Sequence, residues 1–217
     1  MSHFQMTLRR IALHGPAVLT GSETSCHAVH ALDGEAVVNG VGLAVGEGVF
    51  AAGETTVDGR ASILHFLVER TGSPHAAGPG EVVLEAAFDF GERQALIRLD
   101  QVSFPPGARA YRHIHPGPGI RYLTAGRLEI ASDHDITVME AGDAWFEEAL
   151  SPVQATAADV PHTSFIRLLV LPAAFEGKST ISLLDPKDEA LPKLQTNTRF
   201  FDRIVHWPSS ARSASDR

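Results

Sequence analysis

The strongest constraint on the fold is the stretch 107–126, which reads GARAYRHIHPGPGIRYLTAG. Its first part has the composition of a β-strand, and side chains two residues apart on a strand project from the same face. His113 and His115 should therefore point the same way. A Pro-Gly-Pro-Gly turn at 116–119 should fold the apolar run 120–124 back as a second strand. The sequence thus predicts a hairpin that carries two imidazoles near its bend.

Short apolar runs punctuated by glycine, proline or Asn-Gly fill most of the remaining chain. Asn39-Gly40 and Asp58-Gly59 are strong signals for tight turns, because these residue types tolerate positive φ. A further turn is expected near Gly91. Segments of this length and spacing are typical of a chain built from antiparallel strands. The segment 1–20 fits either a first strand or a short helix.

The hairpin resembles the first motif of the cupin family, G-x5-H-x-H-x3,4-E-x6-G. Gly107, His113, His115 and Gly126 stand at the family's spacing, whereas Gly119 takes the place of the glutamate. The resemblance implies an all-β fold, the double-stranded β-helix or jelly-roll barrel of cupins. In that family the two histidines and the glutamate bind a metal, together with a histidine from a second motif.

An internal repeat predicts two such barrels in one chain. Gly34 corresponds to Gly126, and 46–50 and 62–68 correspond to 142–146 and 164–170. Counting back from Gly34, the two histidine positions become Gly21 and Glu23, so the first copy lacks the imidazole pair. The alternative is a chance likeness between β sequences punctuated by glycine.

These patterns divide the chain into five parts. Residues 1–70 form a degenerate N-terminal cupin-like unit, and 71–80 form a linker rich in Gly and Pro. Residues 81–172 form the cupin domain with the His-x-His site. Residues 173–207 are an arm that wraps the barrel or a partner subunit, and 208–217 are a disordered tail.

A metal site at His113 and His115 needs at least one more donor. The second motif should supply a histidine near 153–154, but none stands there, and His162 follows only later in the chain. Glu147 is another candidate, since with two histidines it would suit one divalent Fe, Mn, Ni or Zn ion. The alternatives are a strand-end carboxylate in water and two histidines that only bond to their neighbours.

Polar and aromatic neighbours of the pair are candidates for binding a substrate. Arg121 could hold a carboxylate through two hydrogen bonds, or could be a surface charge whose stem packs on the sheet. Tyr122 stands next to Arg121, and Trp145 shares the strand face of Glu147. His27 and His30 are three apart, so on a strand they would face opposite ways and could not chelate together.

Charge and cysteine content exclude several classes of function. The formal net charge is -8, which argues against partners such as nucleic acid or an anionic membrane surface. Cys26 is the one cysteine, which excludes an internal disulfide and a multi-cysteine zinc site. No apolar run is long enough for a signal peptide or a membrane span, so a cytoplasmic location is expected. Cupins often pair through strand exchange, and the resemblance therefore implies a homodimer.

Three functions fit these features. The first is a metal-dependent enzyme of cupin type, dioxygenase-like or isomerase-like, acting on a small organic molecule. The second is a non-catalytic cupin that binds or senses a small ligand without a metal. The third is a structural or storage protein without a site. No catalytic residue can be assigned from the sequence.

Overall fold

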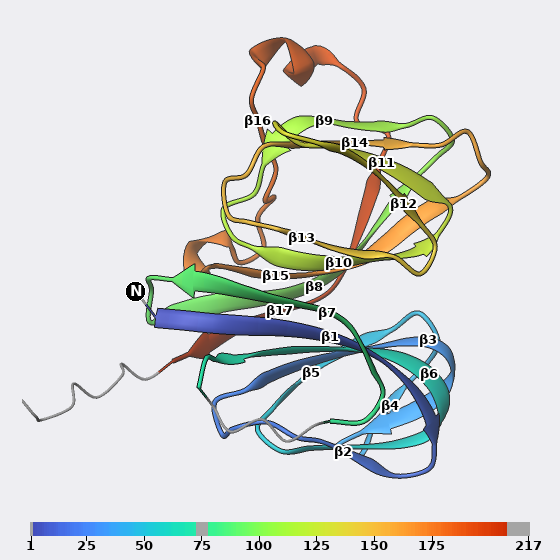
Figure 1. Cartoon of the computed structure of the whole chain (residues 1–217), viewed down its shortest axis with the longest axis vertical. Coiled ribbons are helices and arrows are strands. Elements are labelled where there is room, and N and C mark those ends of the chain that lie inside the picture. The colour runs from blue at the N-terminus through green and yellow to red at the C-terminus, as the bar shows by residue number, and fades with distance from the viewer. Residues whose placement is uncertain (1, 73–77, 208–217) are drawn as a thin grey trace, which may run out of the picture.

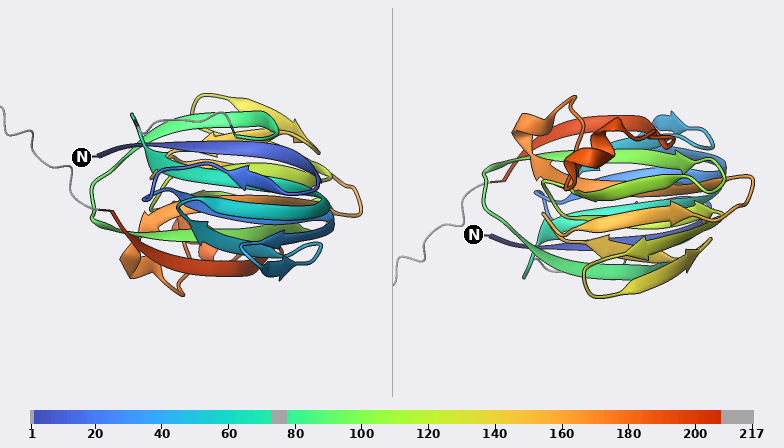
Figure 2. Two further views of the ribbon diagram at one scale, coloured as in Figure 1. Left: turned by 90° about the horizontal axis from the view of Figure 1, so that it is seen from below. Right: turned by 90° about the horizontal axis from the view of Figure 1, so that it is seen from above.

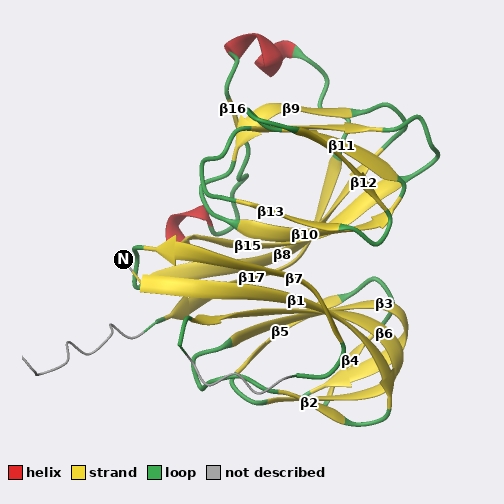
Figure 3. Cartoon of the chain, in the orientation of Figure 1, coloured by secondary structure: helices red, strands yellow, loops and turns green. Residues whose placement is uncertain are grey.

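The computed structural model describes residues 2–72 and 78–207, which form two β-barrels packed against each other (Figure 1). Two 3₁₀-helices are the helical elements of these ranges, η1 (Ala173–Phe175) and η2 (Pro186–Ala190), and the rest of the regular structure is strand (Figure 3). This confirms the predicted all-β fold. In the same two ranges, no helix combines the length and the apolar character needed to cross a membrane.

The first barrel is built from one seven-stranded antiparallel sheet that curls on itself. The order β4-β3-β6-β1-β7 forms its path, while β2 pairs with β6 and β5 pairs with β3. The segment that fitted either a strand or a helix is mostly the long strand β1. The strands are β1 (Ser2–His14), β2 (Ala17–Leu19), β3 (Cys26–Val38), β4 (Val41–Leu43), β5 (Gly48–Ala52), β6 (Thr55–Arg70) and β7 (Glu81–Phe90).

The second barrel consists of two five-stranded sheets, in the orders β13-β10-β15-β8-β17 and β12-β11-β14-β9-β16. The predicted hairpin is formed by β9 and β10, joined by the Pro-Gly-Pro-Gly turn. The strands are β8 (Gln94–Phe104), β9 (Arg109–Ile114), β10 (Gly119–Ala125), β11 (Arg127–Ala131), β12 (Ile136–Glu140), β13 (Ala144–Glu147), β14 (Val153–Ala157), β15 (Thr163–Pro172), β16 (Ser182–Leu183) and β17 (Thr196–His206).

The strand pairing confirms the internal repeat. The order β5-β3-β6-β1-β7 in the first barrel matches β13-β10-β15-β8-β17 in the second. The register of β3 on β6 shifts just before Gly34, and that of β10 on β15 shifts just before Gly126. Both glycines have positive φ, 67° and 79°. A Cβ would approach the backbone oxygen of Arg60 to 2.1 Å at Gly34 and that of His162 to 2.5 Å at Gly126. The repeat therefore preserves a backbone kink that needs glycine.

The two predicted tight turns have different outcomes. Asn39 and Gly40 connect β3 to β4 with φ of 47° and 80°, as expected for a hairpin turn. Asp58 and Gly59 lie inside β6 instead. Gly59 lets β6 approach β3 closely, since its Cβ would lie 2.3 Å from the Glu35 carbonyl oxygen. A dipeptide that favours a turn can thus serve as a point of close strand contact.

The two barrels share one hydrophobic core between their facing sheets. Alternate residues of β1, β3 and β6 point into it from the first barrel, and alternate residues of β8, β10 and β15 point into it from the second. Phe4, Met6, Phe66, Leu99 and Leu168 are fully or almost fully buried there. The other faces of β8, β10 and β15 therefore line the interior of the second barrel.

The C-terminal segment completes the second barrel. β17 pairs along β8 at the edge of the sheet β13-β10-β15-β8-β17. Residues 173–195 run from η1, which lies beside that sheet, to β16 and η2 at the other sheet (Figure 1 and Figure 2). β7 was grouped with the second unit on sequence grounds, but it pairs with β1 of the first sheet. We therefore propose that the second unit begins after β7. Most of the predicted linker, 73–77, and the predicted tail, 208–217, lie outside the described residues.

Candidate functional site

The second barrel encloses a cavity of about 520 Å³. Both of its sheets contribute side chains, and arm residues between Ser179 and Arg199 line the same space. Part of the lining is apolar and includes Phe104, Ile130 and Ala155. Charged and imidazole side chains gather in the remaining part, which is the candidate site.

His113 and His115 lie side by side in this cavity. His113 is on β9 and His115 follows the end of that strand, and both are buried. Their Nε2 atoms are 3.1 Å apart, and their rings meet edge to face. The two-residue spacing thus has the geometry expected from the sequence.

Both imidazoles are oriented by backbone carbonyl groups. His113 Nδ1 donates to the Tyr111 oxygen at 2.6 Å, and His115 Nδ1 donates to the Thr180 oxygen at 2.9 Å. A carbonyl oxygen only accepts, so these bonds place the protons on Nδ1 and leave a lone pair on each Nε2. Burial lowers the pKa of His113, and burial together with Arg167 and Arg121 holds the pKa of His115 well below its usual value. Both rings are therefore neutral at neutral pH, and their two Nε2 lone pairs lie 3.1 Å apart, with Arg167 Nη1 as a donor 3.3 Å from His115 Nε2.

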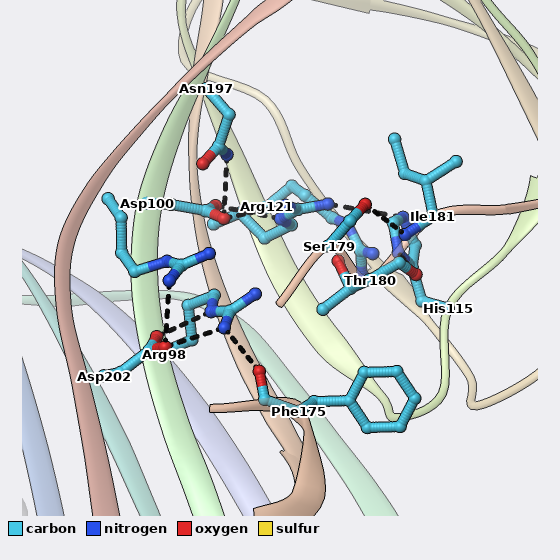
Figure 4. A network of polar contacts seen from close by, with 12 residues as sticks. Arg98, Asp100, His115, Arg121, Phe175, Ser179, Thr180, Ile181, Asn197 and Asp202 are labelled. Carbon is cyan, nitrogen blue, oxygen red and sulfur yellow. Dashed lines mark hydrogen bonds and ion pairs between the residues drawn. The ribbon is translucent and has the colours of Figure 1, made fainter. Parts of the chain in front are cut away.

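A buried ion pair stands beside His115. Arg167 of β15 and Asp100 of β8 are directly opposite each other in the sheet. Two hydrogen bonds join them, from Nε at 2.9 Å and from Nη2 at 2.8 Å, and Arg167 Nη1 lies 3.3 Å from His115 Nε2. Asn197 of β17 also donates to Asp100, at 2.9 Å (Figure 4). Burial opposes the positive charge of Arg167, but the Asp100 carboxylate outweighs it and raises the pKa of the guanidinium.

A second guanidinium comes from β10. Arg121 is fully buried and forms an ion pair with Glu147 of β13, with 2.6 Å between Nη2 and Oε2. Its Nη1 donates to the Gly119 oxygen, and Trp145 Nε1 donates to Glu147 at 2.9 Å. Burial lowers the pKa of Arg121 to about 10, with Glu147 opposing this effect, so the group stays charged at neutral pH.

Sequence reasoning missed the pair Asp100–Arg167 and also Arg98. Arg98 is buried, binds Asp202 of β17 through two hydrogen bonds and donates to the Phe175 and Lys178 carbonyl oxygens of the arm (Figure 4). The signal was present in the strands QALIRLDQVSF and TSFIRLLVLP, where single charges interrupt apolar runs. Charged residues are almost never fully buried without a partner, so such interruptions indicate buried ion pairs.

Two residues expected at the site lie elsewhere, which corrects the sequence-based expectation. Tyr122 points into the core between the barrels, because neighbouring residues of a strand face opposite sides and Arg121 takes the cavity side. His162 is exposed in the loop before β15, and its backbone oxygen lies next to Gly126 rather than near the imidazole pair. His113, His115, Arg121, Trp145 and Glu147 do line the cavity.

The remaining donors do not fit a tightly bound metal ion. Gly119 and Val153 stand where the cupin motifs place the glutamate and the second-motif histidine. In 2–72 and 78–207, no three His, Cys, Asp or Glu side chains are grouped so that they could hold a metal. Glu147 is engaged by Arg121, and the guanidinium of Arg167 lies against His115. Two imidazoles alone give a weak site.

Because the segment with His27 and His30 forms the strand β3, the two histidines face opposite sides of it. His27 Nδ1 lies 2.9 Å from His65 Nε2 inside the first barrel. His30 packs against Phe200 of β17, with ring centroids 5.1 Å apart. They cannot bind one ion together.

Comparisons with known proteins agree with this architecture. Residues 101–156 match the family model described as "Cupin domain". A search of curated proteins finds no match.

Among solved structures, AerE of Microcystis aeruginosa has a TM-score of 0.53 at 16% identity, over 79% of this chain and 89% of that chain. A deletion mutant of Bacillus subtilis oxalate decarboxylase has a TM-score of 0.56 at 12% identity, over 88% and 73%. The salicylate 1,2-dioxygenase of Pseudaminobacter salicylatoxidans has a TM-score of 0.51 at 12% identity, over 90% and 74%. At these identities the likeness concerns the fold.

Proposed function

We propose that this chain is a two-barrel protein of cupin type whose second barrel binds a small organic acid that also carries a hydroxyl group. One observation carries this proposal: a single cavity of about 520 Å³ combines guanidinium donors, a neutral imidazole acceptor and an apolar wall. The first barrel is not assigned a ligand.

The charges at the cavity favour an anion. Five cationic side chains line it, Arg98, Arg121, Arg167, Lys193 and Arg199, against three carboxylates, Asp100, Glu147 and Glu189. Asp202, which does not line the cavity, pairs with both Arg98 and Arg199, so the lining with this partner holds five cations and four carboxylates, whereas the protein as a whole has a formal net charge of -8. A guanidinium can donate to a carboxylate with a charge-assisted hydrogen bond, which is stronger than a neutral one.

The imidazole pair favours a ligand hydroxyl. His113 lines the cavity, and its Nε2, which lies 3.1 Å from His115 Nε2, carries a lone pair because the ring proton is held on Nδ1 by the Tyr111 carbonyl. An O–H group would donate to this nitrogen while the acid group meets Arg167. Trp145 and Phe165, whose rings are 5.3 Å apart, offer an apolar surface for the rest of the molecule.

The names of two fold relatives support this class of ligand. One is an oxalate decarboxylase and the other a salicylate dioxygenase, so both names refer to carboxylic acids. A metal-dependent dioxygenase-like or isomerase-like reaction, expected from the cupin resemblance, would require donors beyond the two imidazoles. Binding or sensing of the ligand without a metal is the reading that the described residues favour.

Thermal-shift and calorimetric titrations test the proposal. Full-length protein is titrated with salicylate, lactate and oxalate, and with benzyl alcohol as a neutral comparison. We expect saturable binding of a hydroxy acid that is lost in Ala155→Leu, because Ala155 lines the cavity. Gln154→Leu changes the next residue of the same strand, which does not line the cavity, and should bind like the parent. Equal binding by both variants would contradict a ligand in this cavity.

The expected homodimer and cytoplasmic location remain predictions. Light scattering during size-exclusion chromatography tests the first, with a mass near twice 23.2 kDa as the expected result. A mass of a single chain would contradict it.

A further inference from the structure

We propose that a guanidinium, not a metal ion, supplies the positive charge at the centre of the second barrel. Arg167, held in place by Asp100, is the group that we assign to this role. The class of ligand rests on the proposed function. The exclusion of a metal ion is argued from the residues of the barrel alone.

The position of the missing glutamate is closed to any side chain. A Cβ at Gly119 would lie 2.3 Å from the Leu168 carbonyl oxygen and 2.7 Å from Leu169 Cδ2. Because β15 runs directly against this point, the loss of the carboxylate is built into the packing of the barrel. The position near the expected second-motif histidine holds Val153, which is buried and pairs with His113 in the sheet. Neither position can donate to a metal.

The lone pair that a metal would need on His115 is already used. Arg167 Nη1 lies 3.3 Å from His115 Nε2, in position to donate to it. Arg167 cannot move away easily, since both of its other nitrogens bind Asp100 and both side chains are buried. Displacing the guanidinium would leave the buried Asp100 carboxylate with Asn197 as its remaining side-chain hydrogen-bond partner among the described residues.

The surrounding charges also disfavour a divalent cation. Arg121 and Arg167 stand opposite each other on β10 and β15, and both are buried beside the imidazoles. The two guanidiniums are already balanced by the Asp100 and Glu147 carboxylates, so a metal ion would add two positive charges at low dielectric with neither carboxylate free to compensate them. The Glu147 carboxylate, which also lines the cavity, forms its ion pair with Arg121. The same arrangement favours an anionic ligand.

The ion pair is specific to the second barrel. In the repeat, the residues that pair across the equivalent strands are Arg9 and His65. The first barrel therefore has no carboxylate–guanidinium pair at this point. The two copies share the strand arrangement without sharing this pair, so the arrangement itself does not require it.

Metal titration tests the proposal without any activity assay. Protein purified without chelator is analysed by mass spectrometry of its metals, and chelator-treated protein is titrated with Mn²⁺ and Zn²⁺ by calorimetry. We expect no saturable binding. One equivalent of metal that disappears in His113→Ala with His115→Ala would overturn the proposal.

A gain-of-function variant tests the part assigned to Arg167. Arg167→His combined with Asp100→Asn removes the ion pair and adds a third imidazole, so we expect a saturable Zn²⁺ site to appear. Arg109→His places an added imidazole on an exposed position of β9 and should not create one. A double variant that keeps a native circular dichroism spectrum but binds no Zn²⁺ would show that the guanidinium does not exclude the ion. This result would contradict the role assigned to Arg167.

Salicylate binding separates this inference from the proposed function. We expect chelator treatment to leave salicylate affinity unchanged, and Arg167→Gln to weaken it on the order of tenfold to a hundredfold. Binding that requires added Zn²⁺ would overturn the guanidinium and keep the organic-acid function. Absence of both salicylate and metal binding would contradict the ligand class and leave the metal-free centre supported.

Discussion

Breaking the Asp100–Arg167 ion pair should strongly destabilise the protein. Asp100 is 1% exposed and Arg167 5%, so removing either partner leaves an uncompensated charge in the interior. Loss of one partner of a buried pair costs about 3–5 kcal/mol. For a chain of this size, that corresponds to a fall of roughly 6–20 °C in Tm. Asp100→Leu and Arg167→Met should each show this effect.

The double variant Asp100→Leu/Arg167→Met should recover most of the loss. Replacing a buried pair by apolar residues is often neutral, so the remaining cost, from the hydrogen bonds of Asn197 and His115, should be about 2 kcal/mol. Urea unfolding followed by tryptophan fluorescence measures the free energy of unfolding of the two single variants and the double variant. The signal reports on both regions, because Trp145 lies at the cavity and Trp207 packs against Phe4 in the core between the barrels.

An exposed ion pair serves as the control for this cycle. Arg112 and Asp133 are 46% and 40% exposed, and Asp133→Asn should change the free energy of unfolding by less than about 1 kcal/mol. If the two single variants at the buried pair cost no more than this control and their effects add, then the pair is solvated. The reasoning about the metal-free centre would then lose its basis.

Three further predictions follow from the structure. Gly126→Ala should destabilise the protein by about 1–3 kcal/mol because φ is 79° and the Cβ meets backbone, whereas Gly91→Ala, with open space and no positive φ, should be nearly neutral in the same unfolding assay. Burial lowers the pKa of His30 to about 4 from 6.5, so its contribution to stability is present above pH 6.5 and is lost as the pH falls toward 4. Unfolding at pH 7 and pH 5 should differ by about 2 kcal/mol through this group, and His30→Gln should reduce the difference; an unchanged difference would contradict it. Burial raises the pKa of Cys26 to about 12, so Ellman's reagent at pH 8 should react only after unfolding, and fast reaction of the native protein would contradict the placement.

Local patterns in the sequence were sufficient to predict the barrels. Glycines at fixed intervals, the paired histidines and the repeat around Gly34 and Gly126 each encode backbone geometry, and the structure contains that geometry. Such features are predictable because they depend on residues close in the chain. Asp58-Gly59 shows the limit, since the contact of β6 with β3 there joins residues that are far apart in the sequence.

The ion pairs of the site could not be predicted in the same way. Asp100 and Arg167 are 67 residues apart, and their pairing depends on the register of β8 against β15. Without that register, the Asp100 and Arg167 charges in apolar strands indicate only that some partner exists. Tyr122 was misplaced for a related reason: on a strand with two buried faces, composition does not reveal which face meets the cavity.

The shared core gives the first barrel, which lacks the His-x-His pair, a structural role. β8, β10 and β15 turn one face toward the first barrel, with Leu99, Tyr122 and Leu168, and the other toward the cavity, with Asp100, Arg121 and Arg167. Guanidiniums on an edge strand or a free sheet could relax toward water and lose their orientation. The first barrel covers the outer face of these strands and so fixes their backbone. The side chains of Asp100, Arg121 and Arg167 therefore form their ion pairs within the second barrel. The first barrel therefore contributes to the site through the rigidity of three strands, although in the described chain it adds no side chain to the cavity.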